Sequence, residues 1–316
     1  HLLAEMLKDS YDCVFLTKSD SSLHIIPEGF EVCVIPGSIE FSEEPLWISK
    51  NYSSSDFIIV ADGYNFTGNY QKKLKKYKFA LIYIDDMVHE RMYADIVVNH
   101  SLNIKADDYI VNSNTRYALG SDYSLLRPLF INAARNTREI KQISQVFICF
   151  GGVDPYNLSN KALEGIVSIE SVKKIHVVVG EFYDHNGSLF LTNGDNTKVI
   201  VYRSISEVQM TALMSKCQLA IVPSSTVSYE ACSVKMLILA GYYVDNQKNI
   251  HDGLKSNGLI YNGDDFREYS SSDFKQKVMD IIDDKRANYK AIISNQSRLF
   301  DGQQKKRFNE LIESIC

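Results

Sequence analysis

Two short segments carry the residue types that bind phosphate groups in proteins. In the first, residues 145–158, an apolar run ends at Gly151 and Gly152 and a helical pattern follows. Glycine lets the backbone approach a ligand closely, and the first turn of a helix presents N–H groups without partners inside the helix. Such groups attract anions, including phosphate. A simple strand-to-helix connection has the same pattern, so this segment alone leaves both interpretations open.

In the second segment, residues 219–232, a strand-like run ends and Ser224, Ser225 and Thr226 open a helix. Hydroxyl groups there either cap the helix, which contributes about 1 kcal/mol, or hold a phosphate. Glu230 follows Thr226 by four residues and therefore lies about one turn further along the same helix face. Its carboxylate is suited to accept hydrogen bonds from a ribose diol. A solvent-exposed helix carboxylate is the alternative interpretation.

Both segments belong to a regular alternation of apolar strands and helices. The predicted strands are residues 13–16, 31–35, 57–61, 79–84 and 96–99 in the first half, and 145–150, 175–179, 199–202, 219–222 and 236–240 in the second. Such strands predict parallel sheets covered by helices on both faces. We therefore predict an α/β fold with two Rossmann-like, doubly wound domains. Ligands in such folds bind at the carboxyl ends of the strands, here in the cleft between the domains.

The length of 316 residues favours two domains. We expect an N-terminal domain over residues 1–132 and a C-terminal, ligand-binding domain over 143–298, with the polar segment 131–143 as the linker. A last helix within 299–316 is expected to cross back to the first domain. The sequence opens with a helical pattern, whereas a doubly wound domain opens with a strand, so we expect that the first strand is missing from this sequence.

Composition narrows the class of partner. A net charge of −5 and a pI near 5.8 argue against a nucleic-acid or anionic-membrane partner. Six cysteines without a CxxC pair suggest a reducing cytoplasm, and neither an apolar run long enough for a membrane span nor a secretory leader is found. No cofactor or metal is expected. Asp85 and Asp86 would point to opposite faces of a strand, which favours a structural or loop-capping role.

Several segments resemble a known family, in the order in which that family has them. They are ADGYNF around Tyr64, IDDMVHERMYADIVVN, YALGSDYSLLRPLF, FGGVDPYNL, VPSSTVSYEACSVKM, the pair Asn246 and Gln247, and DGQQKKR. With them, the chain resembles the UDP-sugar hydrolases of pseudaminic acid biosynthesis and the related spore-coat polysaccharide proteins. These belong with the two-domain GT-B glycosyltransferases. The resemblance runs over nearly the whole chain.

The resemblance implies a UDP site in the second domain and a sugar site that both domains line. Gly151, Gly152 and Asp154 would lie close to the UDP-sugar substrate. The diphosphate would contact Ser224, Ser225 and Thr226, and the ribose would contact Glu230. The sugar would contact Tyr64, Asn246 and Gln247. Tyr64 and Asn246 are the candidate catalytic residues. From the residues alone, Tyr64 would be a core or rim aromatic and Asn246 a turn residue.

The implied activity is hydrolysis of a UDP-linked deoxyamino sugar to UDP and free sugar, in pseudaminic-type (nonulosonic) acid or surface polysaccharide biosynthesis. The family's G-x-G-H-x-x-R segment, whose histidine is thought to act as general base, is absent from this sequence, and His1 lies too close to Leu3 and Ala4 to replace it. A positioned base adds about 10²–10⁴-fold, so we expect UDP binding with little turnover. A GT-B glycosyltransferase and a non-catalytic UDP-sugar-binding protein are the alternatives.

Overall fold

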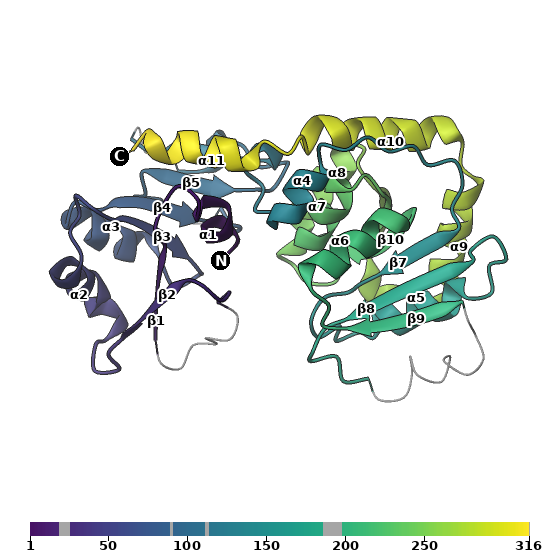
Figure 1. The fold of residues 1–316 in the computed structure, drawn as a ribbon, viewed down its shortest axis with the longest axis horizontal. Coiled ribbons are helices and arrows are strands. Elements are labelled where there is room, and N and C mark those ends of the chain that lie inside the picture. The colour runs from purple at the N-terminus through teal and green to yellow at the C-terminus, as the bar shows by residue number, and fades with distance from the viewer. Residues whose placement is uncertain (19–25, 89–90, 111–113, 186–197, 316) are drawn as a thin grey trace. The chain divides into compact units, whose positions relative to one another are not determined.

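The computed structural model describes residues 1–18, 26–88, 91–110, 114–185 and 198–315 (Figure 1). The chain divides into two compact units. Unit 1 contains His1–Leu125 and Gln303–Cys316, and unit 2 contains Leu126–Gly302. Each unit is built on parallel sheets with helices packed against them.

Unit 2 contains one six-stranded parallel sheet. Its strands are β7 (Gln145–Ile148), β8 (Lys174–Val179), β9 (Val199–Arg203), β10 (Leu219–Pro223), β11 (Leu237–Tyr242) and β12 (Tyr261–Asp265). Their order across the sheet is β12-β11-β10-β7-β8-β9. The chain therefore starts in the middle, builds outward through β9, returns to the middle and builds outward in the other direction. The direction reverses between β7 and β10, and this reversal defines the switch point of a doubly wound sheet.

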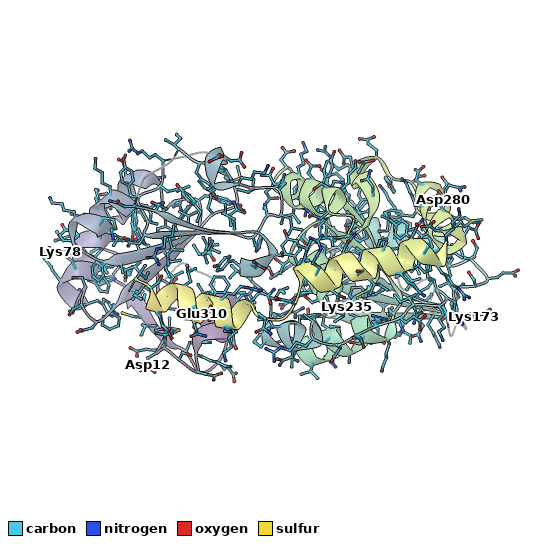
Figure 2. The ribbon with its side chains drawn as sticks, turned by 90° about the horizontal axis from the view of Figure 1, so that it is seen from above. Asp12, Lys78, Lys173, Lys235, Asp280 and Glu310 are labelled. Carbon is cyan, nitrogen blue, oxygen red and sulfur yellow. The ribbon has the colours of Figure 1, made fainter. Side chains whose placement is uncertain are left out.

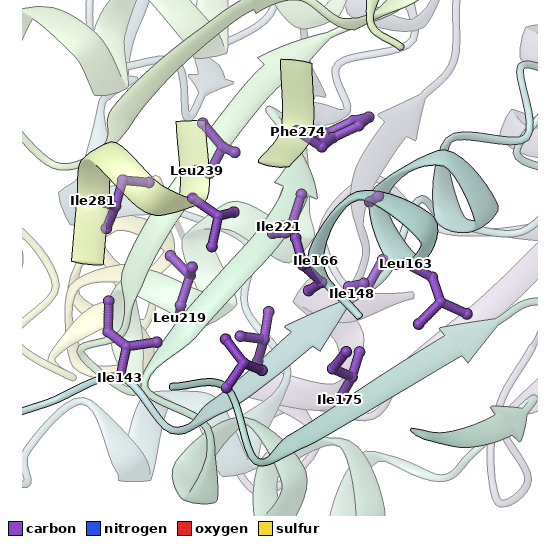
Figure 3. Close-up of a cluster of buried hydrophobic side chains, with 14 of the residues drawn as sticks. Ile143, Ile148, Leu163, Ile166, Ile175, Leu219, Ile221, Leu239, Phe274 and Ile281 are labelled. Carbon is purple, nitrogen blue, oxygen red and sulfur yellow. The ribbon is translucent and has the colours of Figure 1, made fainter. Parts of the chain in front are cut away.

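The core of unit 2 lies between this sheet and the helices α5 (Leu158–Ile166) and α9 (Ser271–Asp283), as Figure 3 shows. Strand side chains alternate between the two faces, and the register aligns Ile148, Ile221 and Leu239 in one row across three strands. All three are fully buried. Strands buried in this way read as continuous apolar runs in the sequence, which is why the pattern predicted them.

The remaining helices of unit 2 are α4 (Pro128–Ala133), α6 (Glu207–Lys216), α7 (Thr226–Ser233), α8 (Gln247–Ser256) and α10 (Arg286–Leu299). Helix α7 packs against β10 and β11, and α10 packs against α7. Figure 2 shows α10 running along unit 2, with Lys235 labelled below it. The Lys235 ammonium is buried and donates hydrogen bonds to the carbonyl oxygens of Ala134 and Ser233, at 2.5 and 3.1 Å.

The segment 131–143, predicted as a linker, is held by unit 2. Helix α4 packs against α6 and α7. The Arg138 guanidinium donates to the carbonyl oxygens of Met214 (3.3 Å), Val234 (3.0 Å) and Cys217 (2.5 Å). These contacts explain why a segment with a polar sequence belongs to a compact unit, and why the units divide after Leu125 whereas the sequence suggested residue 132.

Unit 1 contains two parallel sheets. Strands β1 (Val14–Lys18) and β2 (Glu31–Ile35) form one, and β3 (Ile58–Asp62), β4 (Ala80–Ile84), β5 (Ile96–Asn99) and β6 (Arg116–Leu119) form the other, in that order. Its helices are α1 (Leu2–Leu7), α2 (Glu44–Asn51), α3 (Gly68–Lys76) and α11 (Gln304–Glu313). Helix α11 contacts α1 and the short 3₁₀ helix Ser121–Tyr123.

All ten predicted strands are present, with ends that differ by up to two residues from the predicted ends. The sequence missed β6 and β12. Both lie at the edge of their sheet, and both are short with polar residues that weaken the apolar pattern. Across the ranges described above, no helix has both the length and the apolar character that a membrane span requires.

The contact between α5 and α9 gives a first prediction. A Cβ added at Gly165 would lie 2.2 Å from the Ser271 carbonyl oxygen, which is backbone and cannot move alone. We expect Gly165→Ala to lower the free energy of unfolding by about 1–3 kcal/mol, as overpacking does, despite the higher helix propensity of alanine. Urea denaturation measures this. Gly152→Ala is the control, since a Cβ there has no described atom within 4 Å; equal stability of the two variants would contradict the packing.

Candidate functional site

The two segments singled out from the sequence meet at the switch point of unit 2. Strands β7 and β10 pair directly, with Ile148 opposite Ile221. The Gly151–Gly152 turn follows the carboxyl end of β7, and Ser224 follows the carboxyl end of β10. Because the sheet is parallel, both turns lie at the same edge. In doubly wound sheets this is the place where ligands bind.

The N-terminus of α5, one of the two candidate anion sites, is filled by the protein itself. Asp154 is buried, and its carboxylate accepts the backbone N–H groups of Leu158 and Ser159, each at 2.8 Å. A carboxylate at this position satisfies the unpaired N–H groups and the positive end of the helix dipole. The structure thus gives Asp154 a capping role, and its direct contact with a substrate stays a prediction.

The loop between β7 and α5 is held in an unusual conformation. Gly151, Asp154 and Asn157 have φ angles of +84°, +48° and +52°, in the region that most residues avoid. The Tyr183 hydroxyl donates to Asn157 Oδ1 at 2.6 Å, and His185 Nε2 donates to the Asp154 carbonyl oxygen at 2.6 Å. Glycine, asparagine and aspartate are the residues that adopt this conformation most readily, so the sequence of the loop fits its shape.

The N-terminus of α7 differs from that of α5. Within the described part of the chain, the N-cap residue Ser225 makes no side-chain capping hydrogen bond. Helices α6 and α9 of the same unit are capped by Ser206 and Ser270. Ser225 and Thr226 are half-buried, whereas Ser224 before them is fully buried. Of the two helix ends that the sequence proposed, α7 is therefore the one left available to an anion.

Ser224 is fully buried, and its hydroxyl group belongs to an internal network. Ser224 Oγ lies 3.0 Å from His251 Nδ1, and His251 Nε2 lies 2.9 Å from Asn262 Oδ1. Asn262 Oδ1 also accepts the Asp264 N–H at 3.0 Å, which fixes it as the acceptor. His251 therefore carries its hydrogen on Nε2, and Nδ1 accepts the Ser224 proton. Burial also lowers the pKa of His251, which favours this neutral form. A Ser224 hydroxyl used in this way cannot also donate to a phosphate.

Glu230 is buried, with 3% of its surface exposed. The interpretation as a solvent-exposed helix carboxylate is therefore wrong. Arg127 donates to both of its oxygens, from Nε to Oε1 at 2.6 Å and from Nη2 to Oε2 at 2.8 Å. Sequence reasoning missed Arg127, because 103 residues separate the partners. One feature of the sequence could have pointed to Arg127. It lies within YALGSDYSLLRPLF, one of the segments on which the resemblance is based.

The electrostatics of the pair favour two charged groups. Burial raises the pKa of the Glu230 carboxyl, and the Arg127 guanidinium acts against that rise. Burial also opposes the charge on Arg127, but its bonds to Glu230 leave the pKa of Arg127 above its ordinary value. A carboxylate that accepts two N–H groups side by side has the geometry of an ionised arginine–carboxylate pair.

Asn246 and Gln247 lie after β11, at the same edge of the sheet. Gln247 is buried, and its Oε1 accepts the Tyr243 N–H at 3.0 Å. The Tyr243 hydroxyl in turn donates to the Phe150 carbonyl oxygen at 3.0 Å, next to Gly151. Asn246 is exposed at the start of α8 and makes no capping bond among the described residues. Gln247 thus supports the Gly151 turn, and Asn246 is the member of the pair that faces outward.

Tyr64 lies in unit 1, after the carboxyl end of β3, and is 60% exposed. Its hydroxyl group donates to Asp86 Oδ2 at 2.8 Å. Asp85 is buried and accepts the backbone N–H groups of Met87 and Val88, at 3.2 and 3.1 Å, as the loop-capping prediction required. Among the residues that the structure describes, no group of three or more His, Cys, Asp or Glu side chains has the arrangement of a metal site.

The chain matches no profile of a known protein family. It is similar in sequence to an uncharacterized protein of Methanocaldococcus jannaschii, 26% identical over 253 residues that cover 76% of this chain and 51% of that protein. The spore coat polysaccharide biosynthesis protein SpsG of Bacillus subtilis is 25% identical over 250 residues, covering 78% of this chain and 72% of SpsG. The chain therefore spans about half the length of the first relative.

Solved structures establish the fold. The calicheamicin glycosyltransferase CalG4 aligns with a TM-score of 0.65 at 7% identity, over 99% of this chain and 93% of that one. The Anabaena HepE structure in complex with UDP aligns with a TM-score of 0.65 at 13% identity, over 99% and 95% of the two chains. The chain has the two-domain α/β GT-B fold, and the fold prediction is confirmed.

The cap of α5 gives a second prediction. Asp154→Asn replaces one acceptor oxygen by an amide group that faces a backbone N–H, and we expect the free energy of unfolding to fall by about 1–2 kcal/mol. Thermal and urea denaturation measure the change. Asp252→Asn makes the same chemical change at an exposed position of α8 and should be nearly neutral. Equal effects of the two substitutions would show that the Asp154 cap contributes nothing.

Proposed function

We propose that the chain binds a UDP-sugar at the carboxyl edge of the unit 2 sheet and hydrolyses the bond between the sugar and UDP. The observation that carries the proposal is the pair of turns at the switch point, one glycine-rich and the other leading into a helix whose N-terminus is uncapped in the described chain. The first allows close approach of a ligand, and the second attracts a diphosphate. The similarity to SpsG, named for polysaccharide biosynthesis, supports a substrate of the nucleotide-sugar class.

Ser225 and Thr226 are the hydroxyl groups proposed to donate to the diphosphate. Gly151 and Gly152 are proposed to line the ligand with their backbone. Glu230, whose two oxygens both accept from Arg127, is proposed to act on the ligand through that arginine. Ser224 and Gln247 would act indirectly, since their side chains are committed to His251 and Tyr243. Their role is then to fix the two turns, and the contacts with the ligand fall to their neighbours.

The reaction proposed is attack of water on the anomeric carbon. A bond forms between the water oxygen and that carbon, the bond from the carbon to the UDP oxygen breaks, and UDP leaves with the electron pair while a base takes the water proton. In-line attack inverts the configuration. The end of α7 would stabilise the departing diphosphate by about 0.3–1 kcal/mol if exposed and up to roughly 2 if partly buried. Asn246, the exposed member of the pair after β11, is proposed to contact the sugar.

The diphosphate subsite gives a third prediction. We expect calorimetric titration to show UDP binding that is tighter than UMP or ADP binding. The combined substitution Ser225→Ala and Thr226→Val should raise the dissociation constant for UDP at least about tenfold, since each bond to a charged group contributes about 1.5–3 kcal/mol. Ser206→Ala with Thr211→Val removes the same two groups from α6 and should leave binding unchanged. Unaltered UDP affinity in the α7 variant would exclude this subsite.

The reaction gives a fourth prediction. Incubation with a UDP-linked deoxyamino sugar and no acceptor should release UDP and free sugar in equal amounts. Chromatography of both products measures this. Turnover only when an acceptor is added would indicate a glycosyltransferase, and tight UDP binding without turnover, with or without an acceptor, would indicate a binding protein.

A further inference from the structure

Arg127 has hydrogen-bonding capacity that its partner does not use. Its Nε and Nη2 donate to Glu230, and its guanidinium lies 5.0 Å from the centre of the Phe130 ring. Across the described residues, Nη1 has no hydrogen-bond partner, although it carries two N–H groups. The two side chains also differ in access, since 27% of Arg127 and 4% of Glu230 are exposed. Arg127 is therefore the member of the pair that a ligand can reach.

The position of Arg127 follows from its partner. Glu230 lies on α7 four residues after Thr226, so about 6 Å along the helix axis separates the Glu230 backbone from the first residue of the helix on the same face. Arg127 thus pairs with a residue that lies about one helical turn from the start of α7.

We propose that Arg127 binds the diphosphate of the ligand directly through Nη1, and that Glu230 is the positioning residue that orients it. This inference rests on the proposed function, since it assigns a further residue to the same site. An arginine held by a carboxylate on one edge presents its remaining N–H groups in a fixed plane, which suits the oxygens of a phosphate. A flexible surface arginine would lose side-chain entropy on binding, and the pair has already lost it.

The local charges are consistent with this assignment. Without ligand, Arg127 and Glu230 neutralise each other, and Glu207 lies close enough to affect both. The Glu207 carboxylate is itself engaged, because Oε1 accepts the Leu129 N–H at 2.7 Å. A diphosphate would therefore meet a fixed cation next to an uncapped helix end, and both attract it. If Glu230 instead binds the ribose and Arg127 only supports it, loss of Arg127 would affect recognition of the ribose.

Calorimetric titration with UDP, 2′-deoxy-UDP, uridine and inorganic pyrophosphate distinguishes these roles. For Arg127→Met, we expect the dissociation constants of UDP and pyrophosphate to rise at least about tenfold, the usual loss for a charge-assisted bond. The constant for uridine should change less than about threefold, and the ratio between UDP and 2′-deoxy-UDP should stay as in the wild type. Arg138→Met is the matched control, because Arg138 donates only to backbone carbonyl groups among the described residues.

Arg127→Met leaves Glu230 as a buried, unpaired charge, which can unfold the protein. The double variant Arg127→Met with Glu230→Gln removes both charges, and circular dichroism shows which variants are folded. Loss of UDP and pyrophosphate affinity in the folded variant, with uridine binding kept, supports the inference. Equal weakening of UDP and uridine, or a loss confined to discrimination against 2′-deoxy-UDP, overturns it.

The pyrophosphate titration separates this inference from the proposed function. Pyrophosphate binding that depends on Arg127, in a wild-type chain that binds neither UDP nor uridine, would overturn the nucleotide-sugar proposal and support the anion-binding role of Arg127. Binding of UDP with no effect of Arg127→Met on any ligand would overturn the inference and leave the proposed function intact. A wild-type chain that binds none of the four ligands would overturn both.

Discussion

The direct pairing of β7 with β10 is the constraint on which the candidate site depends. These strands are separated by about 70 residues of sequence, and they become neighbours only because the chain reverses its direction of growth between them. The connections on the two sides of this point cross opposite faces of the sheet. They therefore leave a crevice between them at the carboxyl ends of the two strands. The turns after both strands lie at this edge of the sheet, so two segments that look unrelated in the sequence form one surface.

Two of the helices that begin at this edge, α5 and α7, satisfy their N-terminal N–H groups in different ways. Helix α5 uses an internal anion, Asp154, which is buried and accepts two of those groups. At α7, the side chain at the N-cap position takes no part in capping in the described chain, and the nearest acidic side chain along its face, Glu230, is turned toward Arg127. The N-terminal N–H groups of both helices require acceptors. At α5 the protein supplies the acceptor, and at α7 no side chain at the N-cap position supplies one in the described chain.

The sequence predicted the architecture well because buried parallel strands are continuous apolar runs. It predicted the two turns because glycine and hydroxyl residues interrupt those runs. It could not distinguish which polar side chains are committed inside the protein, since Ser224 pairs with His251 across 27 residues and Gln247 pairs with a backbone group. Nor could it find Arg127, whose partner is fixed only by the tertiary structure. The edge strands β6 and β12 were missed because half-exposed strands need no apolar run.

A buried ion pair contributes little to the free energy of unfolding, because the cost of removing two charges from water is nearly as large as the energy of their attraction. Well-packed apolar side chains at Arg127 and Glu230 would serve α7 as well or better. The pair therefore calls for a reason other than stability, and its geometry supplies one. Both carboxylate oxygens accept from one edge of the guanidinium, Nη1 has no hydrogen-bond partner in the part of the chain that the structure describes, and the arginine is the more exposed partner. A buried carboxylate that fixes the orientation of a cation is useful where that cation has to bind an anion in one position.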